Sequence, residues 1–363
     1  MWNASLKLLL VLVELVESDQ GSASGCLPSE GALSSASALP SVPRGTFRSG
    51  ALCSTWNFLE GEGVFHVEHS TLCTRCALHS QERGGYSGAQ ILRHKKMGRV
   101  IAVANQKGGV GKTTTAINLA SSLAAAEVNT LLVDCDPQSN ATSGLGLRKD
   151  PQRISTYDVL MGAAWAEEAL QLTELEQLWL IPSHKNLIGA NLELVEAEQR
   201  EFRLSHALAP LLERFEFIVL DCPPALDLLT LNALVAANGV LIPMQAEYFA
   251  LEGVSELLDT VERIRAALNP GLEVEGVVLT MFDERTNLAQ QVAEELRKYF
   301  GERMCTTTIP RNIRLAEAPS HGKPALIYDV RSRGAESYIR LAKELMDRQV
   351  ATRKAAAGPV EAA

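Results

Sequence analysis

Residues 107–115 read Lys-Gly-Gly-Val-Gly-Lys-Thr-Thr-Thr, and they follow the apolar run Val100-Ile-Ala-Val-Ala104. The apolar run is typical of a buried strand. After the glycines, an amphipathic helix is expected from near Lys112. A strand, a glycine-rich loop, a Lys-Thr pair and a helix, in this order, indicate a phosphate-binding loop.

The loop contains the groups that a triphosphate requires. Glycines at 108, 109 and 111 are expected to adopt positive φ and to turn backbone N–H groups inward. The N-terminus of the following helix favours bound anions. Lys112 is expected to reach the β- and γ-phosphates, and the Thr113 hydroxyl to ligate Mg²⁺.

A second lysine distinguishes this loop from the common pattern G-x-x-x-x-G-K-[ST]. The frame that ends in Lys112-Thr113 begins at Gln106 rather than glycine, and Lys107 follows it directly. Lys107 is not needed for binding phosphate within its own loop. We therefore expect its side chain to point away from that loop or across to another one.

The loop resembles the deviant Walker A signature (KGGxGKT/S) of the ParA/MinD ATPases, and the chain is most similar to the chromosomal ParA (Soj) branch. The resemblance extends from about Gly98 to about Arg348. It rests on four further stretches, which are Leu131–Thr142, Phe217–Pro224, Gln245–Gly253 and Ile309–Gly322.

The resemblance implies an ATPase with ATP and Mg²⁺ as cofactors. Asp136 would position the attacking water, with Asp134 as the weaker candidate. Asp221 ends an apolar strand in the Walker B arrangement and would hold Mg²⁺ through a water. Asp136 or Asp221 could instead cap the next helix. The ATP-binding residues implied in the loop are Gly108, Gly109, Val110, Gly111, Lys112, Thr113 and Thr114.

Two further roles at the nucleotide follow from the resemblance. Lys107 would act in catalysis, with Lys112, by reaching the partner's phosphates in an ATP-dependent homodimer. Pro310 and Asn312 would contact adenine, although Asn312 could instead cap the next turn.

Non-specific DNA binding is implied for Arg285 and Arg314. The net charge of −9 argues against a generally basic surface, but arginines are concentrated between residues 283 and 340. Such a cluster suggests a local positive face. Solvated surface charge is the alternative.

Composition and patterning predict one α/β domain, a P-loop NTPase with a mostly parallel twisted sheet and helices on both faces. The apolar runs predicted as strands are 99–104, 130–134, 178–181, 217–221, 239–243, 275–281 and 326–328. The helical patterns include 187–213, 250–268, 288–300 and 335–348. The predicted domains are 97–350 for the ATPase and 351–363 for a flexible tail. Cys135, Cys222 and Cys305 are expected to be reduced, buried thiols.

Residues 1–96 lack this periodicity, and several interpretations remain open. They could be a disordered tail, a signal peptide around Leu8–Val13, or a zinc site at His66, His69, Cys73 and Cys76. A fourth hypothesis is that Met97 is the true start and that residues 1–96 are translated upstream DNA. The family's centromere-like site resembles the palindrome TGTTCCACGTGGAACA, which encodes Cys53–Asn57 in one frame and Phe65–His69 in another.

The function implied is a cytoplasmic, nucleoid-associated DNA-partitioning switch. It would bind DNA as an ATP dimer and be released by slow hydrolysis, stimulated by a ParB-like centromere-binding partner. The alternative is a MinD-like, membrane-associated regulator of cell division. The C-terminal residues 348–363 lack the bulky apolar face that membrane docking requires, and no run of 18 apolar residues occurs. A third class, an iron–sulfur ATPase, would need cluster ligands that Cys135 and Cys222 do not match.

Overall fold

The computed structural model describes residues 47–49, 52–54, 97–247 and 250–356. The chain divides into two units, Val11–Arg93 and a larger one formed by Met1–Leu10 with His94–Ala363. In the smaller unit, β1 (Phe47–Ser49) and β2 (Leu52–Ser54) pair as antiparallel strands. The predicted signal peptide, zinc ligands and upstream extension otherwise lie outside the described residues.

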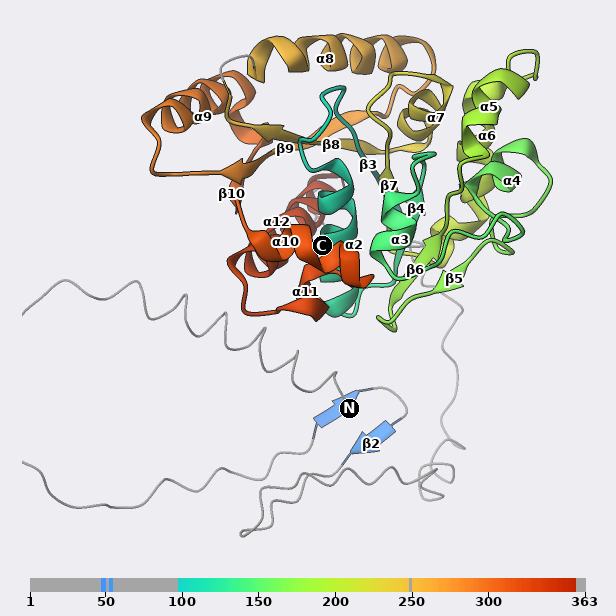
Figure 1. The fold of residues 1–363 in the computed structure, drawn as a ribbon, viewed down its shortest axis with the longest axis horizontal. Helices are drawn as coiled ribbons and strands as arrows, with labels where there is room; N and C mark the ends of the chain where they lie inside the picture. The colour runs from blue at the N-terminus through green and yellow to red at the C-terminus, as the bar shows by residue number, and fades with distance from the viewer. Residues whose placement is uncertain (1–46, 50–51, 55–96, 248–249, 357–363) are drawn as a thin grey trace, which may run out of the picture. The chain divides into compact units, whose positions relative to one another are not determined.

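An eight-stranded sheet forms the centre of the larger unit (Figure 1). Its order is β10-β9-β8-β3-β7-β4-β6-β5, and every neighbouring pair is parallel except β5 with β6. The predicted α/β fold with a mostly parallel sheet is therefore confirmed. The strands are β3 (Arg99–Val103), β4 (Thr130–Asp134), β5 (Gln171–Leu172), β6 (Leu178–Ile181), β7 (Phe217–Asp221), β8 (Gly239–Gln245), β9 (Glu273–Phe282) and β10 (Met304–Pro310).

Helices cover both faces of this sheet, as Figure 1 shows. Alternate residues of the strands enter two separate apolar cores; in β3, Val100 and Ala102 face one core and Ile101 and Val103 the other. The first core is closed by α4 (Thr156–Met161), α5 (Leu187–Glu193), α6 (Arg203–Leu208), α7 (Leu228–Ala236), α8 (Ala250–Ala267) and α9 (Asn287–Phe300). The second is closed by α2 (Lys112–Ala125), α3 (Asn140–Gly144), α10 (Ile313–Glu317), α11 (Ala325–Tyr328) and α12 (Arg333–Ala356).

The predicted elements differ from the structure in several places. Residues 326–328 are helical in α11 rather than a strand, because the backbone N–H groups of Ile327 and Tyr328 both donate to Pro324 O at 3.0 Å and close a helical turn. The helix predicted at 187–213 is divided. Helix α5 ends at Glu193, and α6 begins only at Arg203, after a segment in which Gln199 adopts a left-handed φ of 51°. Pro210 then lies in a short 3-10 turn. Strand β10 was not predicted from periodicity, because its central threonines are not buried.

Helix α12 continues past residue 350 to Ala356, so the helical part of the chain extends into the segment predicted as a flexible tail. Within the described residues, no helix is long and apolar enough to cross a membrane.

Candidate nucleotide and magnesium site

The glycine-rich loop connects β3 to α2 at the carboxyl end of the sheet. Gly109 and Gly111 adopt left-handed φ values of 75° and 85°, as predicted, whereas Gly108 does not. The expectation for Gly108 was wrong because a glycine pattern permits positive φ without requiring it. Gly111 is the N-cap of α2, and its carbonyl accepts a hydrogen bond from Thr115 N at 2.8 Å.

Neighbouring strands hold the loop in place. Asn105 Nδ2 donates to Pro243 O of β8 at 2.8 Å, and its Oδ1 accepts from Lys107 N at 3.0 Å. Thr280 of β9 donates from Oγ1 to Val110 O at 2.8 Å. Sequence reasoning missed both anchors. The position of Asn105 directly before the loop could have indicated the first anchor. Thr280 is remote in sequence, so no local signal indicated the second.

The two lysines of the loop point to different places. Lys112 is 7% exposed, and its Nζ donates back to Lys107 O at 3.0 Å, so its ammonium lies inside the loop. Burial lowers the pKa of Lys112, while Asp221 and other nearby groups oppose this change. Lys107 Nζ instead forms an ion pair with Glu247 at 2.5 Å, outside the loop.

Asp221, at the end of β7, is a buried carboxylate with unsatisfied oxygens. Neither oxygen accepts a hydrogen bond of good geometry from the described residues, although the nearby Thr113 hydroxyl lowers the pKa of Asp221 somewhat. Burial, and then the charge of Asp134, raise the pKa of Asp221 well above its usual range. A buried carboxylate of this kind, beside a threonine hydroxyl, fits a hard divalent cation.

Asp134 and Asp136 lie at the end of β4 and have different surroundings. Asp134 accepts hydrogen bonds from Thr142 N at 2.8 Å and Thr142 Oγ1 at 2.6 Å, so it ties α3 to the sheet. Burial raises the pKa of Asp134 to about 6. Asp136 is 7% exposed, and its Oδ1 accepts from Gln138 N at 2.9 Å. The charge of Asp136 acts on both Asp221 and Lys112, so these groups share one site.

Asn312 caps α10, the alternative that the sequence left open. Its Oδ1 accepts a hydrogen bond from Arg314 N at 2.8 Å. Among the described residues, no hydrogen bond from its Nδ2 accompanies this cap. Pro310, the last residue of β10, is half-buried beside it.

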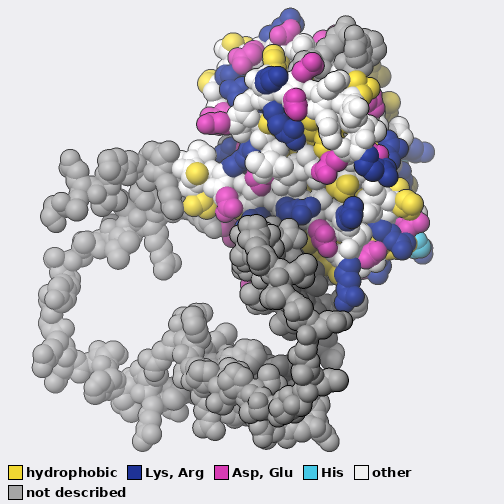
Figure 2. All heavy atoms as spheres, turned by 90° about the vertical axis from the view of Figure 1, so that its left-hand side faces the viewer, with side chains coloured by type: hydrophobic (Ala, Val, Ile, Leu, Met, Phe, Trp, Pro, Cys, Tyr) yellow, Lys and Arg dark blue, Asp and Glu magenta, His cyan; other side chains and the backbone are white. Residues whose placement is uncertain are grey.

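Both predicted DNA-binding arginines are paired with carboxylates. Arg285 is 88% exposed and forms two hydrogen bonds of 2.8 Å with Asp283, which lower the pKa of that carboxyl to about 2. Arg314 bonds Glu317 at 2.9 Å and Asp329 at 3.2 Å. Figure 2, which views the side of α9 and β10, shows many Lys and Arg side chains with Asp and Glu interspersed.

Within residues 97–247 and 250–356, the three cysteines Cys135, Cys222 and Cys305 are free and buried as predicted. Burial raises the pKa of each thiol. In the parts of the chain that the structure describes, no group of three or more His, Cys, Asp or Glu side chains could hold a metal ion by itself.

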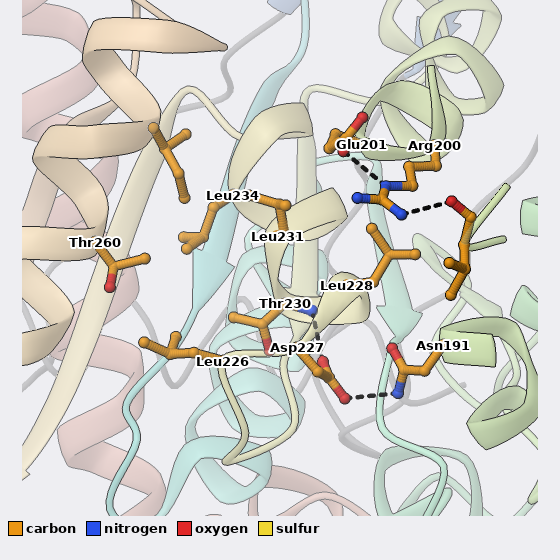
Figure 3. Close-up of a pocket in the computed structure, with 12 residues that line it drawn as sticks. Asn191, Arg200, Glu201, Leu226, Asp227, Leu228, Thr230, Leu231, Leu234 and Thr260 are labelled. Carbon is orange, nitrogen blue, oxygen red and sulfur yellow. Dashed lines mark hydrogen bonds and ion pairs between the residues drawn. The ribbon is translucent and has the colours of Figure 1, made fainter. Parts of the chain in front are cut away.

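A separate hollow of about 420 Å³ lies between α5, α7 and α8 (Figure 3). Asp227 caps α7 at its rim and accepts a hydrogen bond from Asn191 Nδ2 at 2.7 Å. Leucines of α7 form much of its wall. None of the predicted nucleotide-binding residues lines this hollow, so it is distinct from the phosphate-binding loop.

The fold and the loop together define a P-loop ATPase. Residues 98–274 match the family model described as "AAA domain". The chain is 54% identical over 252 residues to the chromosome partitioning protein ParA of Myxococcus xanthus, covering 69% of this chain and 89% of that one. It is 53% identical over 249 residues to the sporulation initiation inhibitor protein Soj of Bacillus subtilis, covering 69% and 98%.

The chain is also similar in fold to a solved structure. The structure named as cobyrinic acid a,c-diamide synthase from Mycobacterium smegmatis, with bound ADP and magnesium, has a TM-score of 0.63 and 35% identity. The match covers 71% of this chain and 98% of that one. The chain belongs to the ParA/Soj family of chromosome-partitioning ATPases.

The buried acids predict an effect of pH on stability. The pKa values of Asp134 and Asp221 are raised in the folded state, so their ionisation is easier after unfolding. Their contribution to stability is complete below about pH 4 and, for Asp134, is lost as the pH rises through about 6. Asp221→Asn removes one of these charges. Without Mg²⁺ and nucleotide, we expect its thermal midpoint to exceed that of the wild type by roughly 2–6 °C near neutral pH.

Thermal unfolding followed by circular dichroism at pH 5 and pH 8 would measure this difference, which should grow with pH. The same variant should be stabilised less by Mg–ATP than the wild type. An apo variant that is less stable than the wild type at pH 8 would contradict the assignment.

Proposed function

We propose that the protein is a partitioning switch that dimerises on binding Mg–ATP and then holds DNA without sequence preference. One observation carries the proposal: Lys112 fills its own loop, whereas Lys107 lies outside it, half-exposed and paired with Glu247. A lysine placed outside its own phosphate site is suited to reach the site of a second copy.

The residues of one chain would provide the binding part of the site. The loop amides and Lys112 would hold the phosphates, and the Nδ2 of Asn312, beside Pro310, would donate to adenine. Thr113 and Asp221 would hold Mg²⁺, which neutralises phosphate charge when it is bound. Asp136 would orient the attacking water from the neighbouring strand end.

Lys107 of each chain would complete the partner's site. Phosphoryl transfer develops negative charge around the β- and γ-phosphates, and a cation supplied in trans stabilises that charge. Hydrolysis would remove the γ-phosphate that holds the two chains together. The dimer would then separate and release the DNA.

The remaining parts of the proposal concern assembly. A ParB-like protein bound at a centromere-like site would stimulate hydrolysis, and the ATP dimers would be associated with the nucleoid in the cytoplasm. We place the catalytic domain at residues 97–350.

Arg285→Glu and Arg314→Glu test the DNA-binding part. Phosphates compete with Asp283 and Glu317 for these guanidinium groups, and a carboxylate in place of either arginine repels the backbone. We expect the double variant to lose DNA binding and to retain ATP binding. For each single variant, the slope of log K against log salt should fall by about 0.9 per lost phosphate contact.

Fluorescence anisotropy with a DNA duplex and ATP across salt concentrations would measure these effects. Arg263→Glu is a matched control, because Arg263 is exposed on α8 and the substitution changes the charge by the same amount. Equal losses for the control and the single variants would reject the assignment to Arg285 and Arg314.

A further inference from the structure

We propose that Glu247 is a positioning residue that holds Lys107 within its own chain and competes with the partner's nucleotide for it. The inference rests on the proposed function, since it concerns the step at which two ATP-bound chains associate. Its consequence is that Glu247 sets how readily the dimer forms.

The contact is specific in geometry. The Lys107 ammonium and a Glu247 carboxylate oxygen are 2.5 Å apart, although the residues are 140 positions apart in sequence. Glu247 lies two residues beyond the end of β8. The last residue of that strand, Gln245, donates from Nε2 to Gly109 O at 3.3 Å. The same strand end therefore contacts the loop and places the carboxylate beside it.

The pair prevents Lys107 from acting in trans while it persists. A single ammonium cannot remain against Glu247 and also lie on the phosphates of a second chain. In the proposed dimer, each Lys107 exchanges a single carboxylate for a more highly charged triphosphate. The exchange is favourable overall, but it is opposed by the pair that must be broken.

The exposure of the pair indicates how strong this opposition is. The side chains of Lys107 and Glu247 are 44% and 52% exposed, so water and salt screen their attraction. Exposed ion pairs of this kind change an equilibrium by about 1.4- to 5-fold. Because two such pairs break in each dimer, the effect on the dimer dissociation constant is about 2- to 30-fold. Such a contact adjusts the equilibrium and does not lock it.

The Glu247→Gln variant tests this inference. At saturating Mg–ATP, its dimer dissociation constant, measured by analytical ultracentrifugation, should be about 2- to 30-fold lower than that of the wild type. Glu262→Gln is the matched control, because Glu262 is exposed on α8 and pairs with Arg265 at 2.7 Å. It makes the same change of charge in a similar ion pair and should leave the dissociation constant unchanged. Glu247→Asp, which keeps the charge, should lie between the wild type and Glu247→Gln.

Salt separates this role from a merely structural one. The ratio between wild type and Glu247→Gln should approach one near 1 M salt, where the screening length falls to about 3 Å. A Glu247→Gln variant that dimerises as the wild type does, or less readily, would overturn the inference, as would a ratio that does not change with salt. A wild-type protein that shows no ATP-dependent dimer would instead overturn the proposed function itself.

Discussion

Asp136→Ala is expected to lower the rate of ATP hydrolysis by about a hundredfold or more while ATP binding persists. Asp136 stands at the carboxyl end of β4, close enough to Asp221 and Lys112 for its charge to act on both. In the proposed site, the loop amides and Lys112 bind the phosphates, and this carboxylate does not. The variant should therefore bind ATP and accumulate as the dimer, because the step that separates the chains is lost.

Phosphate release and light scattering, measured on the same sample with Mg–ATP, would test both parts. Asp150→Ala is a matched control, because Asp150 Oδ1 accepts from Gln152 N at 3.0 Å as Asp136 Oδ1 accepts from Gln138 N at 2.9 Å. The control loses the same kind of turn contact away from the site and should hydrolyse ATP normally. Wild-type hydrolysis by Asp136→Ala would remove Asp136 from the mechanism.

Lys107→Ala is expected to lower the rate of ATP hydrolysis stimulated by the ParB-like protein by about 10³- to 10⁵-fold. This is the range known for a cation supplied in trans. Because Lys112 alone lies within the loop, the variant should still bind ATP as a monomer. Lys112→Ala provides the contrast, since it removes the buried ammonium and should weaken ATP binding itself.

Nucleotide binding by fluorescence and dimer formation by light scattering would separate these two effects. Lys185→Ala, which removes an exposed lysine before α5, is the control and should behave as the wild type. A Lys107→Ala protein that dimerises and hydrolyses ATP fully would exclude the role assigned to Lys107.

The sequence predicted the features that are local in the chain. The strand, loop and helix from 99 to 125 are contiguous, so the position of Lys112 and its loop follows from a short pattern. Asp221 was placed correctly at a strand end for the same reason, because an apolar run that stops at a carboxylate marks the edge of the sheet.

The features that were missed depend on contacts between remote segments. Asn105 reaches Pro243, 138 residues away, and Lys107 reaches Glu247, 140 residues away. No periodicity in one segment indicates which side chain another segment will present. The same limit applies to Asn312, because a motif cannot tell whether an asparagine caps a helix, contacts a base or does both.

A mixture of Lys107→Ala and Asp136→Ala proteins would show whether Lys107 acts on the partner's nucleotide. In a mixed dimer, the Lys107→Ala chain keeps its own Asp136 and receives Lys107 from its partner, so one complete site forms. Each mixed dimer has one complete site out of two. We expect the mixture of two inactive proteins to regain hydrolysis, up to about a quarter of the wild-type rate where the chains pair at random. A mixture in which mixed dimers form but hydrolysis stays as low as in either protein alone would show that Lys107 acts within its own chain.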